Sequence, residues 1–432
     1  MSDRVGCRLV LLASVTLTAG SVALARQDKE PEYRGKKLSA WAEQLKSSEV
    51  KQRVEAATVI GDFRERALPA LDALVVALAD SDAKVKSLAA QALGRIGPGA
   101  TKAVPALIEG TKAADKSVRK DCALALGWIG RRTGGPAVPV LAALLEDREK
   151  EVRTNAALAL GMIGDKAHGT VPALVKALGD DIAMVRSRAA FTLLMLGVEA
   201  KDAAPALAKA TKDADKSVRE HSARALSGIK ADPGFALPVL VSMLKDKENS
   251  VKMAAAVSLG NFRDKAEPAV PALIDALRDP SETVRRDAAF ALGCVGKAAV
   301  PPLLAALKDK EIRVGAMDAI GRVGYEAGDA TPALVALLKD SDPLVRGGAV
   351  AALGHLGSAA KAALPDMIAA LKDENGIVRA VAANAFLLMG DGAKSAVPAL
   401  LEAAKDKVSE VRKNAISTLE LIDPEAAKKA KQ

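Results

Sequence analysis

The stretch VPALIDALRDPSETVRRDAAFALGCVG, residues 270–296, carries the pattern that decides the fold. Apolar residues recur at helical spacing in its first half and again in its second half, so each half is predicted to form a short amphipathic helix. Two helices of this length cannot form a core alone, and similar stretches lie on both sides of them. The predicted core residues are Leu273, Ile274, Leu277, Val284, Ala288, Leu292 and Val295.

The composition also indicates stacked helices. Half of the 432 residues are apolar but only 2% are aromatic, so alanine and leucine must supply most of the packing. Small side chains favour helices that approach closely. One compact core would be unusual at this length, whereas a solenoid grows by adding repeats without enlarging its core. The chain is therefore predicted to form one elongated all-α domain.

Further copies of the pattern align on a basic residue that opens each second helix. Twelve such residues define twelve helical pairs between residues 38 and 423. In most repeats a proline lies fourteen residues earlier, where the first helix begins and the missing N–H group is no loss. The aligned basic residues are Arg53, Lys86, Arg119, Arg153, Arg186, Arg219, Lys252, Arg285, Arg313, Arg346, Arg379 and Arg412.

In nine repeats an aspartate stands six residues before the basic residue. It would lie at the carboxyl end of the first helix, where the helix dipole disfavours a negative charge, so it needs a partner. We expect it to pair with the arginine of the same or the next repeat, forming an Asp–Arg ladder. The alternative is that the basic column binds nucleic-acid phosphates. The aspartates are Asp80, Asp147, Asp180, Asp213, Asp246, Asp279, Asp340, Asp373 and Asp406.

The order Pro, Asp, Val-Arg and Ala-Ala-x-Ala-Leu-Gly in paired helices resembles the HEAT repeat, specifically the short bacterial type associated with phycobilisome lyases. The resemblance covers residues 38 to about 423. It implies a right-handed α-solenoid of about twelve HEAT-like helical pairs, with the second helices lining the concave side. It implies no single activity, because such repeats serve as scaffolds, adaptors and a few enzymes.

Residues 1–25 follow a different pattern. Arg4 and Arg8 give a basic start, Leu9–Leu24 is mostly apolar, and Ala23-Leu24-Ala25 matches a small-residue cleavage site. This pattern predicts a secretory signal peptide cleaved after Ala25 and a protein exported to the periplasm or beyond the cell. The alternative is that the segment is retained as a membrane anchor.

Three further segments lie outside the repeats. Residues 26–37 are charged and aperiodic and are predicted to form a flexible leader. Trp41 is expected to plug the exposed first layer, and the lysine-rich tail at residues 424–432 to cap the last layer in solvent. We expect no stretch after residue 25 to be long and apolar enough to span a membrane.

One irregularity interrupts the repeat. The link between Gly296 and Pro301 is short, and Pro301 lies two residues closer to Arg313 than the equivalent prolines do to their arginines. Repeat nine is therefore predicted to sit at a different angle and to change the local curvature of the superhelix.

Patterns typical of catalysis are weak. His168, His221 and His355 lie in separate repeats, and none has an acid or a cysteine at metal-ligand spacing. Deoxyhypusine hydroxylases share this repeat type and bind iron through His-Glu pairs, which this sequence lacks. We expect no catalytic residue, cofactor or metal site. The alternative is a HEAT-repeat enzyme of the deoxyhypusine hydroxylase or bilin lyase type.

Positions two, five and nine after the aligned basic residue should face the groove, and they vary most between repeats. Positions five and nine carry the apolar residues. In repeats three to five and eight they form an apolar stripe that would suit a protein partner, unless its side chains pack on each other. The stripe comprises Leu124, Trp128, Leu158, Met162, Phe191, Met195 and Phe290, and its polar rim Asp121, Asn155, Arg188, His221, Arg224 and Asp287.

These patterns predict an exported, non-catalytic scaffold that binds a protein or peptide in its concave groove. The net charge of +9 is spread along the chain, so no nucleic-acid partner is expected, and the protein is expected to be a monomer.

Overall fold

The computed structural model describes residues 30–133 and 135–431. The predicted signal peptide lies outside the described residues. The chain divides into two compact units, Met1–Ala203 and Ala204–Gln432, which are described separately as unit 1 and unit 2. Both units are built from paired α-helices, and the only strands in the described ranges form a short ribbon near residue 35.

The described ranges contain the twelve predicted helical pairs and one additional helix, which was not predicted. The first helices are α1 (Leu38–Gln44), α3 (Leu71–Ala77), α5 (Val104–Gly110), α7 (Ala137–Ala143), α9 (Val171–Ala177), α11 (Ala204–Ala210), α13 (Pro233–Met243), α15 (Val270–Ala276), α17 (Val300–Ala306), α19 (Thr331–Leu337), α21 (Leu364–Ala370) and α23 (Val397–Ala403). The second helices are α2 (Val50–Asp62), α4 (Ala83–Ile96), α6 (Lys116–Thr133), α8 (Lys150–Ile163), α10 (Ala183–Leu196), α12 (Lys216–Gly228), α14 (Asn249–Asn261), α16 (Glu282–Val295), α18 (Arg313–Val323), α20 (Pro343–Leu356), α22 (Gly376–Met389) and α24 (Ser409–Ile422).

Most pairs are joined to the next by a 3-10 segment. These segments contain small residues, and their buried alanines fill the space between layers. Their bounds are η1 (Arg64–Ala70), η2 (Gly97–Ala103), η4 (Gly164–Thr170), η5 (Gly197–Ala203), η6 (Arg263–Ala269), η7 (Gly296–Ala299), η8 (Gly324–Ala330), η9 (Gly357–Ala363) and η10 (Gly390–Ala396), and η3 (Leu144–Glu146) ends α7.

The pair α15/α16 shows why the sequence folds in this way. Pro271 lies in the first turn of α15, where proline is tolerated, and Gly296 ends α16 in a backbone conformation with φ +80° that favours glycine. The predicted core residues of this pair are all buried except Ile274, which is half-buried. The predicted amphipathic pattern is therefore confirmed for this repeat.

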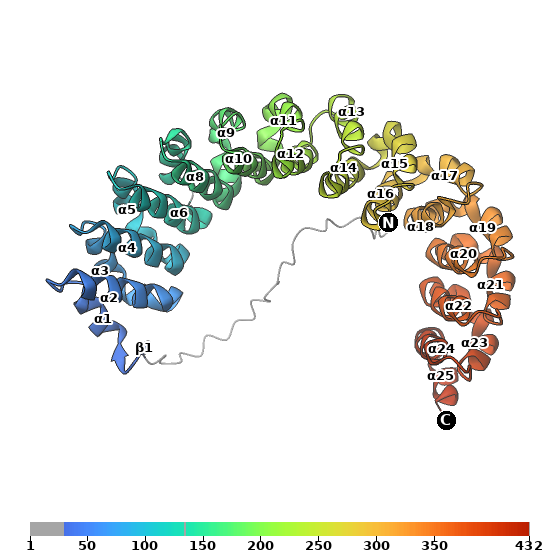
Figure 1. Cartoon of the computed structure of the whole chain (residues 1–432). Helices are drawn as coiled ribbons and strands as arrows, with labels where there is room; N and C mark the ends of the chain where they lie inside the picture. The colour runs from blue at the N-terminus through green and yellow to red at the C-terminus, as the bar shows by residue number, and fades with distance from the viewer. Residues whose placement is uncertain (1–29, 134, 432) are drawn as a thin grey trace. The chain divides into compact units, whose positions relative to one another are not determined.

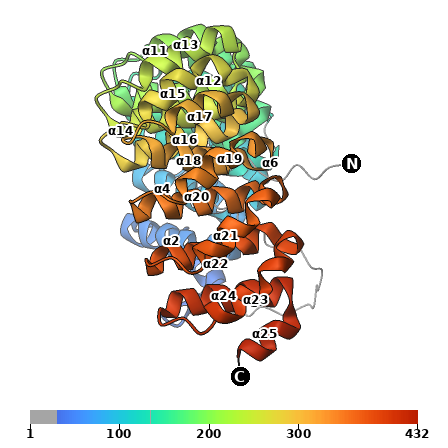
Figure 2. The ribbon, with the colours of Figure 1, turned by 90° about the vertical axis from the view of Figure 1, so that its right-hand side faces the viewer.

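The second helices of neighbouring repeats pack closely. In each unit they form one row and the first helices another (Figure 1), and Figure 2 shows α18, α20, α22 and α24 following one another in unit 2. A Cβ atom at Gly127 in α6 would lie 2.7 Å from Ala159 Cα in α8. Only glycine allows this approach, which explains why small residues dominate the composition.

The flexible leader predicted for residues 26–37 is wrong for residues 30–37. Strands β1 (Glu32–Tyr33) and β2 (Lys36–Lys37) form an antiparallel ribbon, because Arg34 and Gly35 both take positive φ and make a tight turn. The ribbon covers Trp41, whose indole N–H donates to the Lys36 carbonyl at 3.1 Å. Trp41 is 4% exposed, so the prediction that it plugs the first layer is confirmed.

The carboxyl end covers the last layer, as predicted, but it does so as a packed helix and not as a tail in solvent. Residues Pro424–Ala430 form a helix, α25, which Asp423 caps by accepting from the Ala426 amide at 3.0 Å. Ala426 and Ala427 are buried, and α25 contacts α23 and α24. The tail therefore covers the last layer as a packed helix.

One stretch, Glu282–Ala306, has the length and hydropathy of a membrane span, so the prediction that none would follow residue 25 is wrong. The stretch does not form one straight helix, because Gly296 separates α16 from η7 and α17. Its apolar residues form the core of two adjacent repeats, which accounts for its hydropathy.

Repeat nine has a shortened second helix. Helix α18 begins at Arg313 and has 11 residues, whereas α16 and α20 have 14 and begin three residues before the aligned arginine. The missing turn agrees with the shortened sequence, and the predicted change of curvature stays a prediction.

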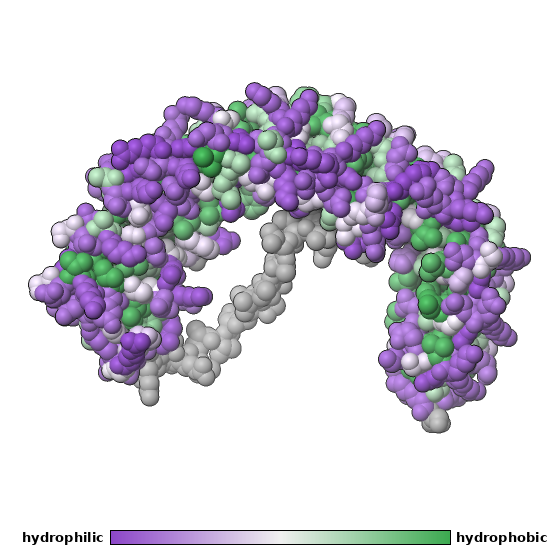
Figure 3. Space-filling view, viewed as in Figure 1, coloured by the Kyte–Doolittle hydropathy of each residue, from purple (hydrophilic) through white to green (hydrophobic). Residues whose placement is uncertain are grey.

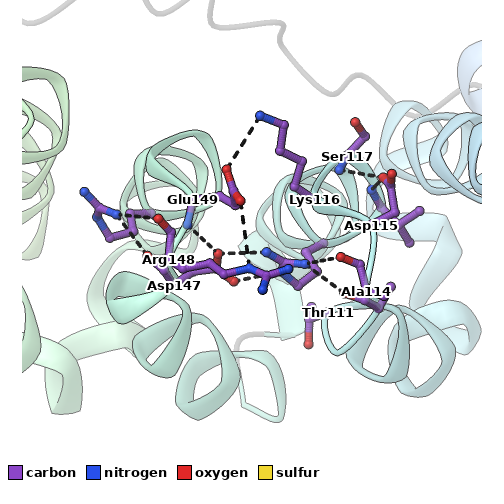
Figure 4. Close-up of polar contacts among 12 residues, drawn as sticks. Thr111, Ala114, Asp115, Lys116, Ser117, Asp147, Arg148 and Glu149 are labelled. Carbon is purple, nitrogen blue, oxygen red and sulfur yellow. Dashed lines mark hydrogen bonds and ion pairs between the residues drawn. The ribbon is translucent and has the colours of Figure 1, made fainter.

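The predicted Asp–Arg ladder is present, and each rung joins a basic residue to the aspartate of the next repeat. In one rung the Arg119 Nε and Nη2 atoms donate to Asp147 Oδ2 and Oδ1 at 2.8 and 3.0 Å. The Arg119 Nη1 atom donates to the carbonyls of Ala113 and Ala114, both at 2.9 Å. Figure 4 shows this junction, where Asp147 also accepts from the Glu149 amide at 2.9 Å.

Pairs of this kind recur along the described residues. Their side chains are mostly buried, so the basic residues of these pairs are held in structural contacts between repeats. The pairs are Arg53–Asp80, Arg119–Asp147, Arg153–Asp180, Arg219–Asp246, Lys252–Asp279, Arg313–Asp340, Arg346–Asp373 and Arg379–Asp406.

Replacing Asp147 with alanine should lower the free energy of unfolding by about 2 kcal/mol, between the cost of losing an exposed and a fully buried ion pair. Lys86→Ala is the matched control, because Ala113 stands where its partner aspartate would be and Lys86 forms no ion pair among the described residues. It should cost less than about 0.5 kcal/mol. Urea unfolding followed by circular dichroism measures both, and equal losses would contradict the role of the rung.

The ladder should make the protein sensitive to acid. The hydrogen bond from Arg346 lowers the pKa of Asp373, and that from Arg379 lowers the pKa of Asp406. A carboxyl with a lowered folded-state pKa stabilises the fold above its unfolded pKa of about 3.9, and this contribution is lost as the pH falls through the folded value.

The thermal midpoint should therefore change little between about pH 7 and 5 and fall steeply below about pH 4. Melting curves at a series of pH values measure this. Asp373→Asn, which cannot titrate at this position, should melt lower at pH 7 and show a smaller fall in acid. An equal fall in parent and variant would show that other groups cause the acid sensitivity.

Candidate functional site

Six of the seven predicted stripe residues lie in unit 1 on three neighbouring second helices. Helix α6 contacts α8, and α8 contacts α10, so each helix places its residues next to those of the following repeat. The pairs are Leu124 and Trp128 on α6, Leu158 and Met162 on α8, and Phe191 and Met195 on α10.

Trp128 and Met195 are the exposed members of this group. They are 44% and 43% exposed, and the Trp128 indole N–H has no hydrogen-bond partner among the described residues. A Cβ atom at Gly94 in α4 would lie 3.7 Å from Trp128 Cδ1, so the ring rests against α4 where no side chain displaces it. An indole held in this way offers a large apolar face and a free donor.

The other four residues, Leu124, Leu158, Met162 and Phe191, are half-buried. The stripe was predicted either to be exposed or to be packed on itself, and the structure has some of each. These four side chains are half-buried, whereas Trp128 and Met195 face solvent. The view in Figure 3 is mainly hydrophilic, with hydrophobic side chains in small separate areas. We name Trp128, Met195 and these four residues the unit 1 stripe.

Phe290 does not belong to the unit 1 stripe, because it lies in unit 2 on α16. It is half-buried, and the guanidinium carbon of Arg322 in α18 lies 5.9 Å from its ring centroid. The Arg322 Nε atom also donates to both carboxylate oxygens of Asp318 at 3.1 Å. Phe290 is therefore covered by Arg322, which Asp318 holds in place. Sequence analysis missed this contact although Asp318 and Arg322 occupy the same groove positions in repeat nine.

The prediction that Asp121 lies on an accessible rim is wrong. It is 4% exposed and accepts hydrogen bonds from Ser87 Oγ and from Gln91 Nε2, the latter at 2.8 Å. These donors come from α4, so Asp121 joins α4 to α6. Its buried position follows from the close packing of the second helices, which encloses position two of this repeat.

The remaining rim residues of unit 1 are half-buried. The Asn155 side-chain amide donates to the Glu151 carbonyl of its own helix at 3.0 Å. Arg188 lies on α10 and forms no ion pair among the described residues. Among the predicted rim residues of unit 1, Arg188 is therefore the charged side chain that could pair with a partner beside the unit 1 stripe.

In unit 2 the predicted rim residues form a charged group. Arg224 on α12 is exposed and donates to Glu220 at 2.9 Å, and His221 beside it is half-buried. Burial raises the pKa of Asp287 on α16 above its ordinary value, and the charges of Arg286, Arg224 and Arg322 oppose this only in part.

Cys122 and the possible metal ligands are the other reactive groups to consider in the part of the chain that the structure describes. Burial raises the pKa of the Cys122 thiol to about 12, and the charge of Asp121 adds to the effect, so this thiol is protonated at neutral pH. Within the residues that the structure describes, no three His, Cys, Asp or Glu side chains gather closely enough to hold a metal ion.

Solved structures with the same fold include Kap95p, karyopherin Kap121p and importin beta. Kap95p in a structure with RanGDP is 14% identical with a TM-score of 0.60, over 91% of this chain and 64% of that one. Karyopherin Kap121p bound to the extreme C-terminus of the protein phosphatase Cdc14p is 16% identical with a TM-score of 0.61, over 89% and 49%. Importin beta is 16% identical with a TM-score of 0.59, over 89% and 61%. These identities show the fold alone, and the chain spans about half to two-thirds of the length of each protein.

Sequence comparison identifies the family. The model described as PBS lyase HEAT-like repeat matches residues 284–309, and no curated protein matches the chain. The model described as HEAT repeats matches residues 38–127, 71–147, 104–194, 171–260, 204–293, 300–387 and 364–430. Because these matches span nearly all the described residues, the chain belongs to the HEAT-repeat family.

Proposed function

We propose that this protein is an exported, non-catalytic scaffold that binds a protein partner through the unit 1 stripe. The observation that carries the proposal is the pair of large, solvent-exposed side chains, Trp128 and Met195, on a base of four half-buried apolar residues. Aromatic and methionine side chains are enriched in protein interfaces, and a tryptophan in a well-packed surround is a frequent hot spot.

The geometry supports a protein ligand because the stripe extends over three stacked helices. An extended or helical segment of a partner could contact Trp128, Met162 and Met195 in turn, with Arg188 beside them for a polar contact. The related folds give independent support, because Kap121p was solved bound to the extreme C-terminus of Cdc14p and, in other structures, to Nup53p and Pho4p.

The binding test uses a double variant of the exposed residues, Trp128→Asp together with Met195→Asp. Leu421→Asp is the matched control, because Leu421 occupies the same repeat position in α24, lies in unit 2 and is 61% exposed. The partner is first captured from an envelope extract, then purified, and its Kd is measured with each variant. Loss of two anchors should weaken binding at least about a hundredfold, at about 1.4 kcal/mol per tenfold.

Leu421→Asp should leave the Kd of the purified partner within about twofold of the parent value. Circular dichroism and thermal melting establish that all three proteins are folded. If the double variant binds as tightly as the parent while melting at the same temperature, the unit 1 stripe is not the binding surface. If both variants weaken binding equally, the partner does not distinguish the two surfaces.

Export is proposed from the sequence of residues 1–25, which combines a basic start, an apolar segment and a small-residue cleavage site. Expression of the full chain in a bacterium should yield a mature protein that begins at Arg26 in the periplasmic or culture fraction. Intact-mass measurement of the fractionated protein checks this. Recovery of the uncleaved chain in the membrane fraction would support a retained anchor, and its recovery in the cytoplasm would contradict export.

A further inference from the structure

The Asp–Arg ladder is interrupted between α16 and α18. Leu307 occupies the position of the ladder aspartate, six residues before Arg313. The structure places Asp309 in the corresponding role, because Asp309 Oδ1 accepts from the Glu311 amide at 2.9 Å, as ladder aspartates accept from the amide two residues on. Repeat nine therefore still carries the carboxylate, displaced by two residues along the chain.

Asp309 does not reach the arginine of repeat eight. Its Oδ2 atom accepts instead from Nη2 of Arg278, which lies at the end of the first helix of repeat eight. Arg278 also lies 3.5 Å from Glu311. The loss of the first turn of α18 has moved the carboxylate to Arg278, and Arg285 is left without it.

Arg285 is nevertheless held as the other ladder arginines are. Its Nη1 atom donates to the carbonyls of Asp279 and Pro280 at 2.8 and 3.0 Å, as Arg119 Nη1 does to its own loop. These contacts fix the guanidinium plane. The Nε and Nη2 atoms, which bind aspartate in a complete rung, have no partner among the described residues. The Nε and Nη2 atoms of Arg285 are thus held in a fixed orientation and are free to donate to a carboxylate.

A cleft of about 810 Å³ opens beside Arg285, lined by the loop between α15 and α16, by α16, and by α18 with the residue Glu311 before it. Buried Leu277 and Ala289, with Val314 at 48% exposed, give it apolar walls. The size is sufficient for several side chains of a bound segment.

Most of the acidic residues around the cleft are already paired. Asp279 accepts from Lys252 at 2.6 Å, Asp318 from Arg322, and Glu311 lies beside Arg278. Glu282 is exposed in the first turn of α16 and forms no ion pair among the described residues. Arg286, which also lines the cleft, lies 3.9 Å from Asp287. The Nε and Nη2 donors of Arg285 are therefore the cationic donors in the cleft that have no carboxylate partner among the described residues.

We propose that this cleft binds an acidic side chain of a partner protein segment, whose carboxylate completes the missing rung on Arg285. The aspartate or glutamate would accept from Nε and Nη2 in the bidentate geometry of the other rungs, and an adjacent apolar residue would contact Leu277 and Val314. This surface is distinct from the unit 1 stripe, so the proposal does not rest on the proposed function.

The test uses a fluorescein-labelled, capped peptide with a central glutamate flanked by leucines, and the same peptide with glutamine in its place. Binding to the full chain is followed by fluorescence anisotropy. The glutamate peptide should bind at least tenfold more tightly than the glutamine peptide. Arg285→Gln should remove this preference, and Arg285→Lys, which keeps the charge but cannot make two parallel bonds, should reduce it.

Arg412→Gln is the matched control. Arg412 is the last arginine of the column, and its Nη1 atom holds the carbonyls of Asp406 and Lys407 in the same way, but it does not line this cleft. The preference for glutamate should survive in this variant. Circular dichroism checks that each variant is folded, and the comparison of the two peptides on the parent protein does not depend on any variant.

Three results would overturn the proposal. The two peptides could bind equally or not at all at millimolar protein, the preference could persist in a folded Arg285→Gln variant, or it could be lost equally in Arg412→Gln. A competition experiment with free glutarate shows whether the bound carboxylate must belong to a peptide. If free glutarate displaces the glutamate peptide at an equal concentration, the cleft selects a small dicarboxylate and the proposed protein partner is wrong.

Discussion

The rung between a buried arginine and the aspartate of the next repeat is the contact on which the stack depends. The arginine donates through Nη1 to two carbonyls of its own loop and through Nε and Nη2 to one carboxylate, as Arg119, Arg219 and Arg346 do. One arginine side chain therefore binds the loop carbonyls of its own repeat and also fixes the position of the next repeat relative to it. Apolar packing alone is not directional in this way, since alanine and leucine faces can slide by one helical turn.

Much of the fold followed from the sequence because the repeat supplies the same evidence many times. The helical pairs, the ladder and the plug at Trp41 were each predicted from a spacing. The errors fall where a segment occurs only once. The ribbon before Trp41 depends on a turn with two positive φ values at Arg34 and Gly35, and α25 depends on a single cap at Asp423. A feature that occurs only once cannot be identified by comparing one repeat with another.

The candidate site was predicted less well, because helical spacing gives the face of a side chain but not its neighbours. Trp128 and Met195 are exposed as the spacing indicated, whereas Asp121 is enclosed by Ser87 and Gln91 of the preceding repeat. Phe290 is likewise covered by Arg322 of the following repeat. The free donors of Arg285 could not be foreseen from the missing acid at Leu307 alone, because Asp309 could have replaced it. Only its contact with Arg278 shows otherwise.

The two covered ends have a consequence for assembly. Each layer of a solenoid presents an apolar face that another layer can bury, so an uncovered first or last repeat would accept a second chain and begin an open-ended filament. Here the ribbon lies over Trp41 at one end, and at the other Ala426 and Ala427 pack α25 onto the last pair. The apolar faces of the first and last described layers are therefore buried within the chain itself, which removes the surface that head-to-tail stacking of a second chain would need.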